Sequence, residues 1–195
     1  MRCLTAEEVV SLYGPIGFSV SDENRWYRRE LVLQSERASR QVRVSASPPT
    51  ILGALAPFIQ ELNRWLPTER SRLFWVSHWQ SGNPHDSEAF VRAARQGAGE
   101  PRSLDEAPGH YFGAHPYENL DITETTPEHN CELGVLIGLV SMLLIESSDG
   151  WLLAEGCTDR VEFWEGNVLF HSEDREKIGE ADALLKSYGC PPEMR

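Results

Sequence analysis

The sequence predicts an α+β protein: an antiparallel sheet, made of a C-terminal meander and an N-terminal hairpin, with about four or five helices packed on it. Three observations support this class. One segment has helical periodicity, several short apolar runs end at turn residues, and helices and strands do not alternate as in parallel βαβ folds. The 195 residues, 41% of them hydrophobic, suit one domain, residues 1–195. A division into two lobes, 1–102 and 103–195, is the alternative.

The N-terminal region predicts a short helix followed by a hairpin. Thr5 and Glu8 have the spacing of a capping box, which predicts a helix over Ala6–Tyr13. Apolar and polar residues alternate over Glu30–Gln34 and again over Gln41–Ala46. We expect these two runs to pair as the strands of the hairpin.

The middle of the first half predicts helix, strand and helix in turn. Apolar residues recur every three or four positions from Ile51 to Leu66, and Pro67 ends that helix. Arg72–Trp79 has the composition of a strand, and a second helix is expected over Ser87–Arg95. Residues 100–125 show no period and are expected to form a long structured loop.

The C-terminal region predicts a meander and a final helix. Thr126 and Pro127 resemble a helix start, so 126–139 is expected to be helical, with a buried strand as the alternative because of its β-branched residues. The last helix is expected to begin after Ser172 and to run to about Tyr188. Four β-favourable runs lie between these helices: Val140–Glu146, Trp151–Ala154, Val161–Trp164 and Val168–His171.

The charge is strongly asymmetric along the chain. The formal net charge is -12, yet residues 1–102 carry a small positive excess, and residues 103–159 contain eleven acidic residues and neither Lys nor Arg. An acidic surface repels nucleic acids and anionic membranes, so we expect neither as a partner. An aromatic and Arg-rich cluster, Arg25–Arg29, is expected to pair with the acidic middle of the chain instead.

No targeting or membrane signal is visible in the sequence. The first twenty residues lack the basic and apolar regions of a signal peptide, and the longest apolar run, Leu133–Ile145, is too short to span a bilayer. Four Cys residues are far apart and form no C-x-x-C pair. We therefore expect a cytoplasmic protein with free thiols, and the sequence leaves its oligomeric state open.

Motifs for catalysis and cofactor binding are weak. The chain has no nucleotide-binding glycine motif and no H-E-x-x-H, so we expect no cofactor and no metal. One region still gathers reactive side chains, namely His110, His115, His129 and Cys131. A small hydrolase or metal-dependent enzyme that uses this region is the alternative to a binding protein.

Acidic and aromatic residues in and beside the loop predict a surface for a protein partner. Carboxylates steer a basic partner, and Trp and Tyr anchor interfaces because they bury large apolar areas. No catalytic residues are assigned. The predicted partner-binding residues are Trp79, Asp105, Glu106, Tyr111, Tyr117, Glu118, Asp121 and Glu124.

In overall plan the chain resembles the immunity proteins that bacteria pair with secreted toxins, including type VI secretion effectors. The resemblance is carried by the acidic aromatic segment Asp105–Glu132 and by two C-terminal runs, Gly150–Gly156 and Val161–Phe170. It implies a non-catalytic cytoplasmic inhibitor that binds a cognate toxin enzyme. Because nuclease toxins need basic surfaces to hold phosphates, an acidic inhibitor would complement a toxin of that kind.

Overall fold

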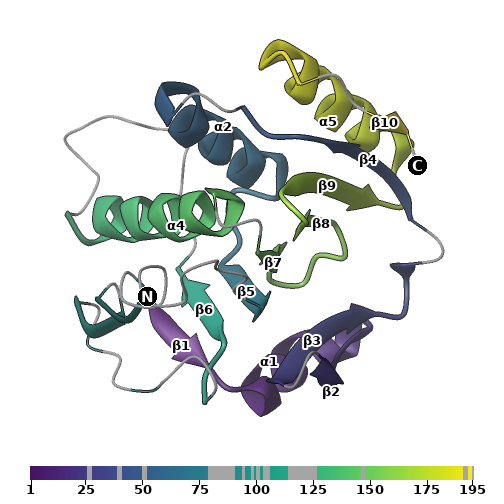
Figure 1. The fold of residues 1–195 in the computed structure, drawn as a ribbon. Helices are drawn as coiled ribbons and strands as arrows, with labels where there is room; N and C mark the ends of the chain where they lie inside the picture. Colours follow the sequence, from purple (N-terminus) through teal and green to yellow (C-terminus); the bar gives the residue numbers. More distant parts are fainter. Residues whose placement is uncertain are drawn as a thin grey trace.

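The structure is a computed structural model, and its central feature is one large antiparallel sheet (Figure 1). It describes residues 1–25, 28–38, 41–49, 52–78, 91–93, 95–97, 99, 102, 106–113, 127–145, 148–190 and 193–194. In spatial order the strands of the sheet are β1 (Arg2–Leu4), β6 (Gly109–Phe112), β5 (Arg72–His78), β7 (Asp149–Ala154), β8 (Arg160–Trp164), β9 (Asn167–Ser172), β4 (Val42–Ala46) and β10 (Glu193–Met194).

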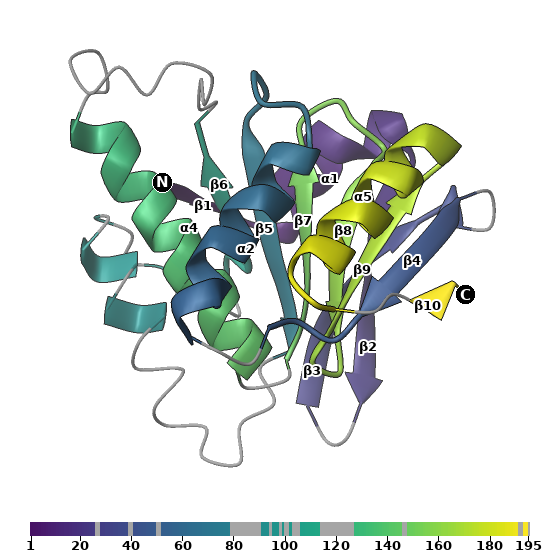
Figure 2. The ribbon, with the colours of Figure 1, turned by 90° about the horizontal axis from the view of Figure 1, so that it is seen from above.

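Different elements cover the two faces of this sheet (Figures 1 and 2). Three helices, α2 (Leu52–Trp65), α4 (Pro127–Ile145) and α5 (Arg175–Ser187), lie on the face that we call the helical face. The opposite face, here the ribbon face, carries helix α1 (Ala6–Tyr13), the 3-10 turn η1 (Gly14–Ile16) and a two-stranded ribbon of β2 (Phe18–Arg25) and β3 (Arg28–Ser35). The sheet is therefore the middle layer of three.

Alternation along each strand divides the apolar residues between two cores. On β5, Phe74 and Val76 belong to the core under the helices, while Leu73 and Trp75 belong to the core under the ribbon. Successive side chains of a strand point to opposite faces, so a strand covered on both sides needs apolar residues at nearly every position. The near-continuous apolar run Leu73–Val76 follows from this double burial.

Several predicted elements are confirmed, and so is the α+β class. Helix α1 has the predicted bounds, and the side chains of Thr5 and Glu8 form both hydrogen bonds of a capping box. Helix α2 follows the predicted period, and α5 begins after an Asp174 N-cap. The meander β7–β8–β9 is present, and Glu165 and Gly166, both with positive φ, form the turn between β8 and β9.

The predicted hairpin between Glu30–Gln34 and Gln41–Ala46 is wrong, although both runs are strands. β3 pairs with β2, whereas β4 pairs with β9 and β10. The N-terminal hairpin is therefore the β2–β3 ribbon, which lies in a different layer from β4 (Figure 1). The polar residues of β2 between Ser21 and Arg25 gave no strand signal, because this part of the ribbon has little apolar surface to bury.

Helix α4 corrects two expectations for the middle of the chain. It is the helix expected over 126–139, not the strand, but it continues to Ile145 through the residues expected as the strand Val140–Glu146. Leu136, Leu139, Val140 and Leu143 are completely buried, and their spacing of three and four matches one face of a helix. Packing against the sheet and α2 overrides the β preference of the branched side chains.

The region expected as a loop, 100–125, contains strand β6, which joins β1 to β5. The expected helix Ser87–Arg95 is helical where it is described, at 91–93 and 95, and the helix continues to 97. Strands from both halves of the chain share the large sheet. In the part of the chain that the structure describes, no helix is long and apolar enough to cross a membrane.

Candidate functional site

Two of the eight predicted partner-binding residues, Glu106 and Tyr111, lie in the described part of the chain. Both are on or next to β6, which the sheet places beside β1. The six others lie outside the described residues: Trp79, Asp105, Tyr117, Glu118, Asp121 and Glu124.

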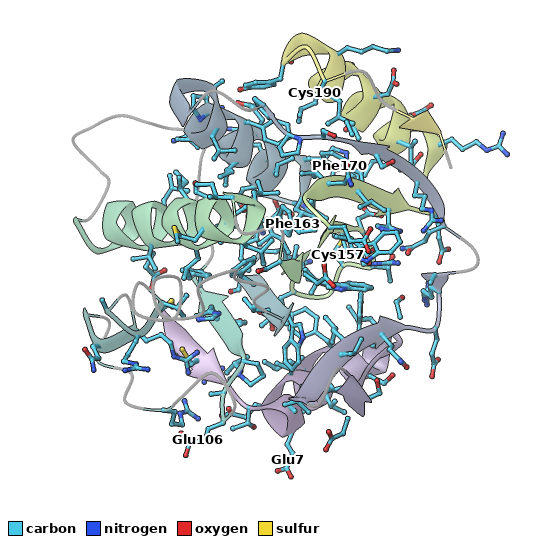
Figure 3. The ribbon with its side chains drawn as sticks, in the orientation of Figure 1. Glu7, Glu106, Cys157, Phe163, Phe170 and Cys190 are labelled. Carbon is cyan, nitrogen blue, oxygen red and sulfur yellow. The ribbon has the colours of Figure 1, made fainter. Side chains whose placement is uncertain are left out.

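Glu106 is exposed at the rim of the molecule, and Glu7 points outward from the same rim (Figure 3). Glu8, also exposed, follows Glu7 on α1. Arg102 links the two segments, because its guanidinium donates to the carbonyl oxygen of Cys3 at 2.6 Å and lies 3.6 Å from the Glu8 carboxylate. We call Glu7, Glu8 and Glu106 the acidic rim; two of its members come from the N-terminal helix, outside the predicted acidic segment.

Tyr111 is held by neighbours of its own chain. Its hydroxyl donates to Oε2 of Glu155 at 2.5 Å, and the Arg2 guanidinium lies 5.0 Å from the centre of its ring. Burial raises the pKa of Tyr111, and the hydrogen bond to Glu155 raises it further. The ring is only half-buried, so Tyr111 offers part of one face to a partner while its hydroxyl is already occupied.

His110, a member of the alternative enzymatic site, is a core residue. Its side chain is completely buried, with Nε2 3.2 Å from Nη1 of Arg95 and Nδ1 3.4 Å from the carbonyl oxygen of Phe74. Arg can only donate, so the neutral ring accepts at Nε2 and donates from Nδ1. This imidazole has both nitrogens engaged and no exposed surface for a substrate.

The rest of that alternative site is not brought together by the described side chains. His115 and the side chains of His129 and Cys131 lie outside the described residues, and the helix α4 carries the backbone of the latter two. Among the residues whose placement is described, no three His, Cys, Asp or Glu side chains are grouped as metal ligands would be.

A polar cluster that the sequence did not indicate lies on the ribbon face, over β7, β8, β9 and β4. We call it the Arg160 cluster; it consists of Gln41, Trp151, Arg160, Glu162 and His171. The strand register explains the grouping, since Arg160 is directly opposite His171 on β9, and Trp151 is directly opposite Glu162 on β8. Arg160 and His171 are buried, with 1% and 4% of their surface exposed.

Four side chains of the cluster, those of Trp151, Arg160, His171 and Glu162, are in contact with one another. The Arg160 guanidinium lies 4.6 Å from the centre of the Trp151 ring, and the His171 ring is parallel to that indole at 6.4 Å. Nη2 of Arg160 lies 3.2 Å from Nδ1 of His171. Nε2 of His171 is 2.7 Å from Oε2 of Glu162, although the angle between the groups is not that of a good hydrogen bond.

Electrostatics fix the protonation of the cluster. Burial lowers the pKa of His171, and the positive charges of Arg160 and Arg43 lower it further against the opposing effect of Glu162. Burial also lowers the pKa of Arg160, to about 10, so this side chain still carries its charge at pH 7. His171 is neutral there, so among the side chains that the structure describes two Arg charges face one carboxylate.

The buried polar atoms without a hydrogen-bond partner concentrate in this cluster. In the described part of the chain they include Nε and Nη1 of Arg160 and Oε1 of Gln41. The hydroxyl of Tyr13 is a further such atom, but it lies under the ribbon, outside the cluster. Gln41 is tied to the start of the same strand, because its amide nitrogen donates to the carbonyl oxygen of Thr158 at 2.9 Å, two residues before Arg160. Buried donors and acceptors are rarely left unpaired, so these atoms mark a polar site.

A further polar group, on the helical side of the same strands, is structural. Asp159 accepts from the Ser172 hydroxyl at 2.6 Å, and its second oxygen lies 3.5 Å from Nζ of Lys177. Cys157 is adjacent, and burial is the main cause of its raised pKa, so its thiol is a poor nucleophile at neutral pH. These contacts fasten the β7–β8 connection to α5.

The sequence contained one signal that could have pointed to the Arg160 cluster. Arg160 and Glu162 alternate with the apolar residues of a predicted strand, which places both on one face. Their meeting with His171 depends on the register of β8 and β9, and the approach of Gln41 depends on β4 pairing with β9. No protein-family model matches the chain, and no curated protein or solved structure is significantly similar to it.

Proposed function

We propose that this protein acts by binding a basic protein partner, as a cytoplasmic immunity protein that inhibits a cognate bacterial toxin, for example a nuclease effector of a type VI secretion system. The observation that carries the proposal is the charge distribution. Residues 103–159 contain eleven acids and no Lys or Arg, and the acidic rim extends this charge to Glu7 and Glu8 on α1.

The geometry supports binding through this region in two ways. Glu7 and Glu106 are exposed and point away from the fold, so their carboxylates add to the negative potential that attracts a basic surface (Figure 3). Tyr111 lies on β6, within the acidic segment Asp105–Glu132. Exposed charge pairs contribute only about 0 to 1 kcal/mol each, so aromatic contacts such as that of Tyr111 would supply most of the affinity.

The test begins with the protein encoded next to this chain in its genome. That protein is expressed alone and together with this chain, and growth is compared; the purified pair is then mixed in a stopped-flow binding assay. We expect rescue of growth and an association rate that falls steeply as salt is added. A neighbouring protein that is not toxic and does not bind contradicts the proposal.

A matched pair of variants tests the acidic surface itself. Asp105→Asn, Glu106→Gln and Glu118→Gln together should lower the association rate at low salt by roughly tenfold. The control neutralises Glu165, Glu176 and Glu180, which are exposed on the β8–β9 turn and on α5. Both variants lose the same number of negative charges. An equal fall in the association rate would therefore show that the net charge of the protein matters, and not the position of these residues.

A further inference from the structure

We propose that the Arg160 cluster is a binding site for a small oxyanion that carries a hydroxyl, with hydrogen phosphate as the representative ligand. Arg160 is the central residue of the proposed site. Its side chain is 1% exposed, and only Nη2 has a hydrogen-bond partner, the neutral His171. A buried guanidinium with two unpaired nitrogens is costly, and an oxyanion supplies acceptors for both.

The charges of the corner favour an anion. Arg160 lies in one row with His171 on β9 and Arg43 on β4, each directly opposite its neighbour. Glu162 is the carboxylate next to this row, and it lies against Nε2 of His171. The Asp159 carboxylate, one residue before Arg160, faces the helical side, where it is occupied by Ser172 and Lys177. Among the described side chains, one positive charge is thus left uncompensated in a protein whose net charge is -12.

The second unpaired group selects the kind of anion. Oε1 of Gln41 is a buried acceptor without a donor, while the amide nitrogen of the same side chain is fixed on Thr158. A ligand that reaches from Arg160 to Gln41 would therefore accept from the first residue and donate to the second. Hydrogen phosphate has acceptor oxygens and a P–OH group at pH 7, whereas sulfate has acceptors alone.

Arg43 is a second cation beside the cluster. It is exposed and lies directly opposite His171 on the neighbouring strand, so its charge adds to that of Arg160. The Trp151 ring stacks on Arg160, so the side chains of the site are held by four adjacent strands, β7, β8, β9 and β4.

The experiment titrates the full chain with sodium phosphate and with sodium sulfate at pH 7 and equal ionic strength, using calorimetry and thermal unfolding. We expect phosphate to bind with a Kd near the millimolar range and, at ten times that concentration, to raise Tm by about 3 °C. Sulfate should bind at least tenfold more weakly. Absence of phosphate binding to the wild type, or equal binding of both anions, overturns the proposal.

Variants identify the site of binding. Arg160→Met should weaken phosphate binding at least tenfold, whereas Arg70→Gln, at an exposed Arg in the turn after α2, should leave it unchanged. If the Met variant does not fold, Arg160→Lys replaces it in the test. Lys keeps the charge but has fewer donors in the required directions, so this variant should bind phosphate severalfold more weakly than the wild type. Phosphate binding that is unaffected in a folded Arg160 variant places the ligand elsewhere and overturns the proposal.

Discussion

Two buried arginines, Arg72 on the helical face of the central sheet and Arg160 on the ribbon face, differ in how their guanidinium groups are satisfied. On the helical face Arg72 uses all three nitrogens: Nε donates to Oδ1 of Asn63 at 2.6 Å, and the other two donate to the carbonyl oxygens of Arg70, Asn63 and Leu66. On the ribbon face, Arg160 has one bonded nitrogen and two without a partner. Both side chains are 1% exposed.

The difference separates a structural arginine from one that is suited to bind a ligand. Asn63 and Leu66 lie at the C-terminal end of α2, where carbonyl groups have no partner within the helix. Arg72 caps these carbonyl groups and joins the helix to β5, so hydrogen bonds within the fold offset the free-energy cost of burying its guanidinium. Within the described part of the chain Arg160 bonds to no helix end, and its positive charge is stabilised by stacking on Trp151 and by the His171–Glu162 pair.

The largest effect expected from this comparison is on Arg72. Arg72→Met removes the donors from buried carbonyl groups and from the Asn63 side chain, so we expect a loss of about 3 to 5 kcal/mol in the free energy of unfolding. Urea unfolding followed by circular dichroism measures it. A loss below about 1 kcal/mol would mean that water replaces the guanidinium at the end of α2.

Arg160→Met should behave in the opposite way in buffer without phosphate. Replacing a poorly paired buried cation by an apolar side chain of similar length is often neutral or stabilising, so we expect a change between about 0 and 2 kcal/mol toward greater stability. The same urea titration measures it beside the Arg72 variant. A loss as large as that of Arg72→Met would show that the two arginines are equivalent, and would remove the contrast between the faces.

The smallest effect is a pH dependence that originates from His171. Because its pKa is lowered in the folded protein, the unfolded chain binds the proton more readily, and stability falls as pH drops below about 6.5. In the His171→Gln variant, the urea midpoint of unfolding should therefore change less between pH 7.5 and pH 5.5 than it does in the wild type. An unchanged pH profile in the variant would mean that His171 does not titrate differently in the two states.

Local patterns predicted some elements of the fold well. The capping box at Thr5 and Glu8 and the period of Leu52–Trp65 are signals contained within one segment, and both helices formed as expected. Helix α4 was harder, because its apolar residues lie on all sides and its sequence fits a helix or a strand equally. Packing of Leu136 and Leu143 against the sheet and α2 decided the outcome.

For the candidate sites, the sequence indicated where the charged residues are but not which of them lie close together in the fold. It located the acidic segment, and Glu106 is exposed as a steering residue should be. It did not indicate that Glu7 and Glu8 of α1 lie on the same rim, or that His110 is buried against Arg95. Such relations depend on β6 pairing with both β1 and β5, which joins segments about a hundred residues apart.

The sequence by itself determined the α+β class, the C-terminal meander and the concentration of acidic residues in 103–159, because composition and period are properties of single segments. The tertiary structure decided which strands are neighbours. Only the order β7–β8–β9–β4 brings Trp151, Arg160, His171 and Gln41 to one corner. Strand order and register arise from burying two apolar faces at once, and that requirement involves the whole chain.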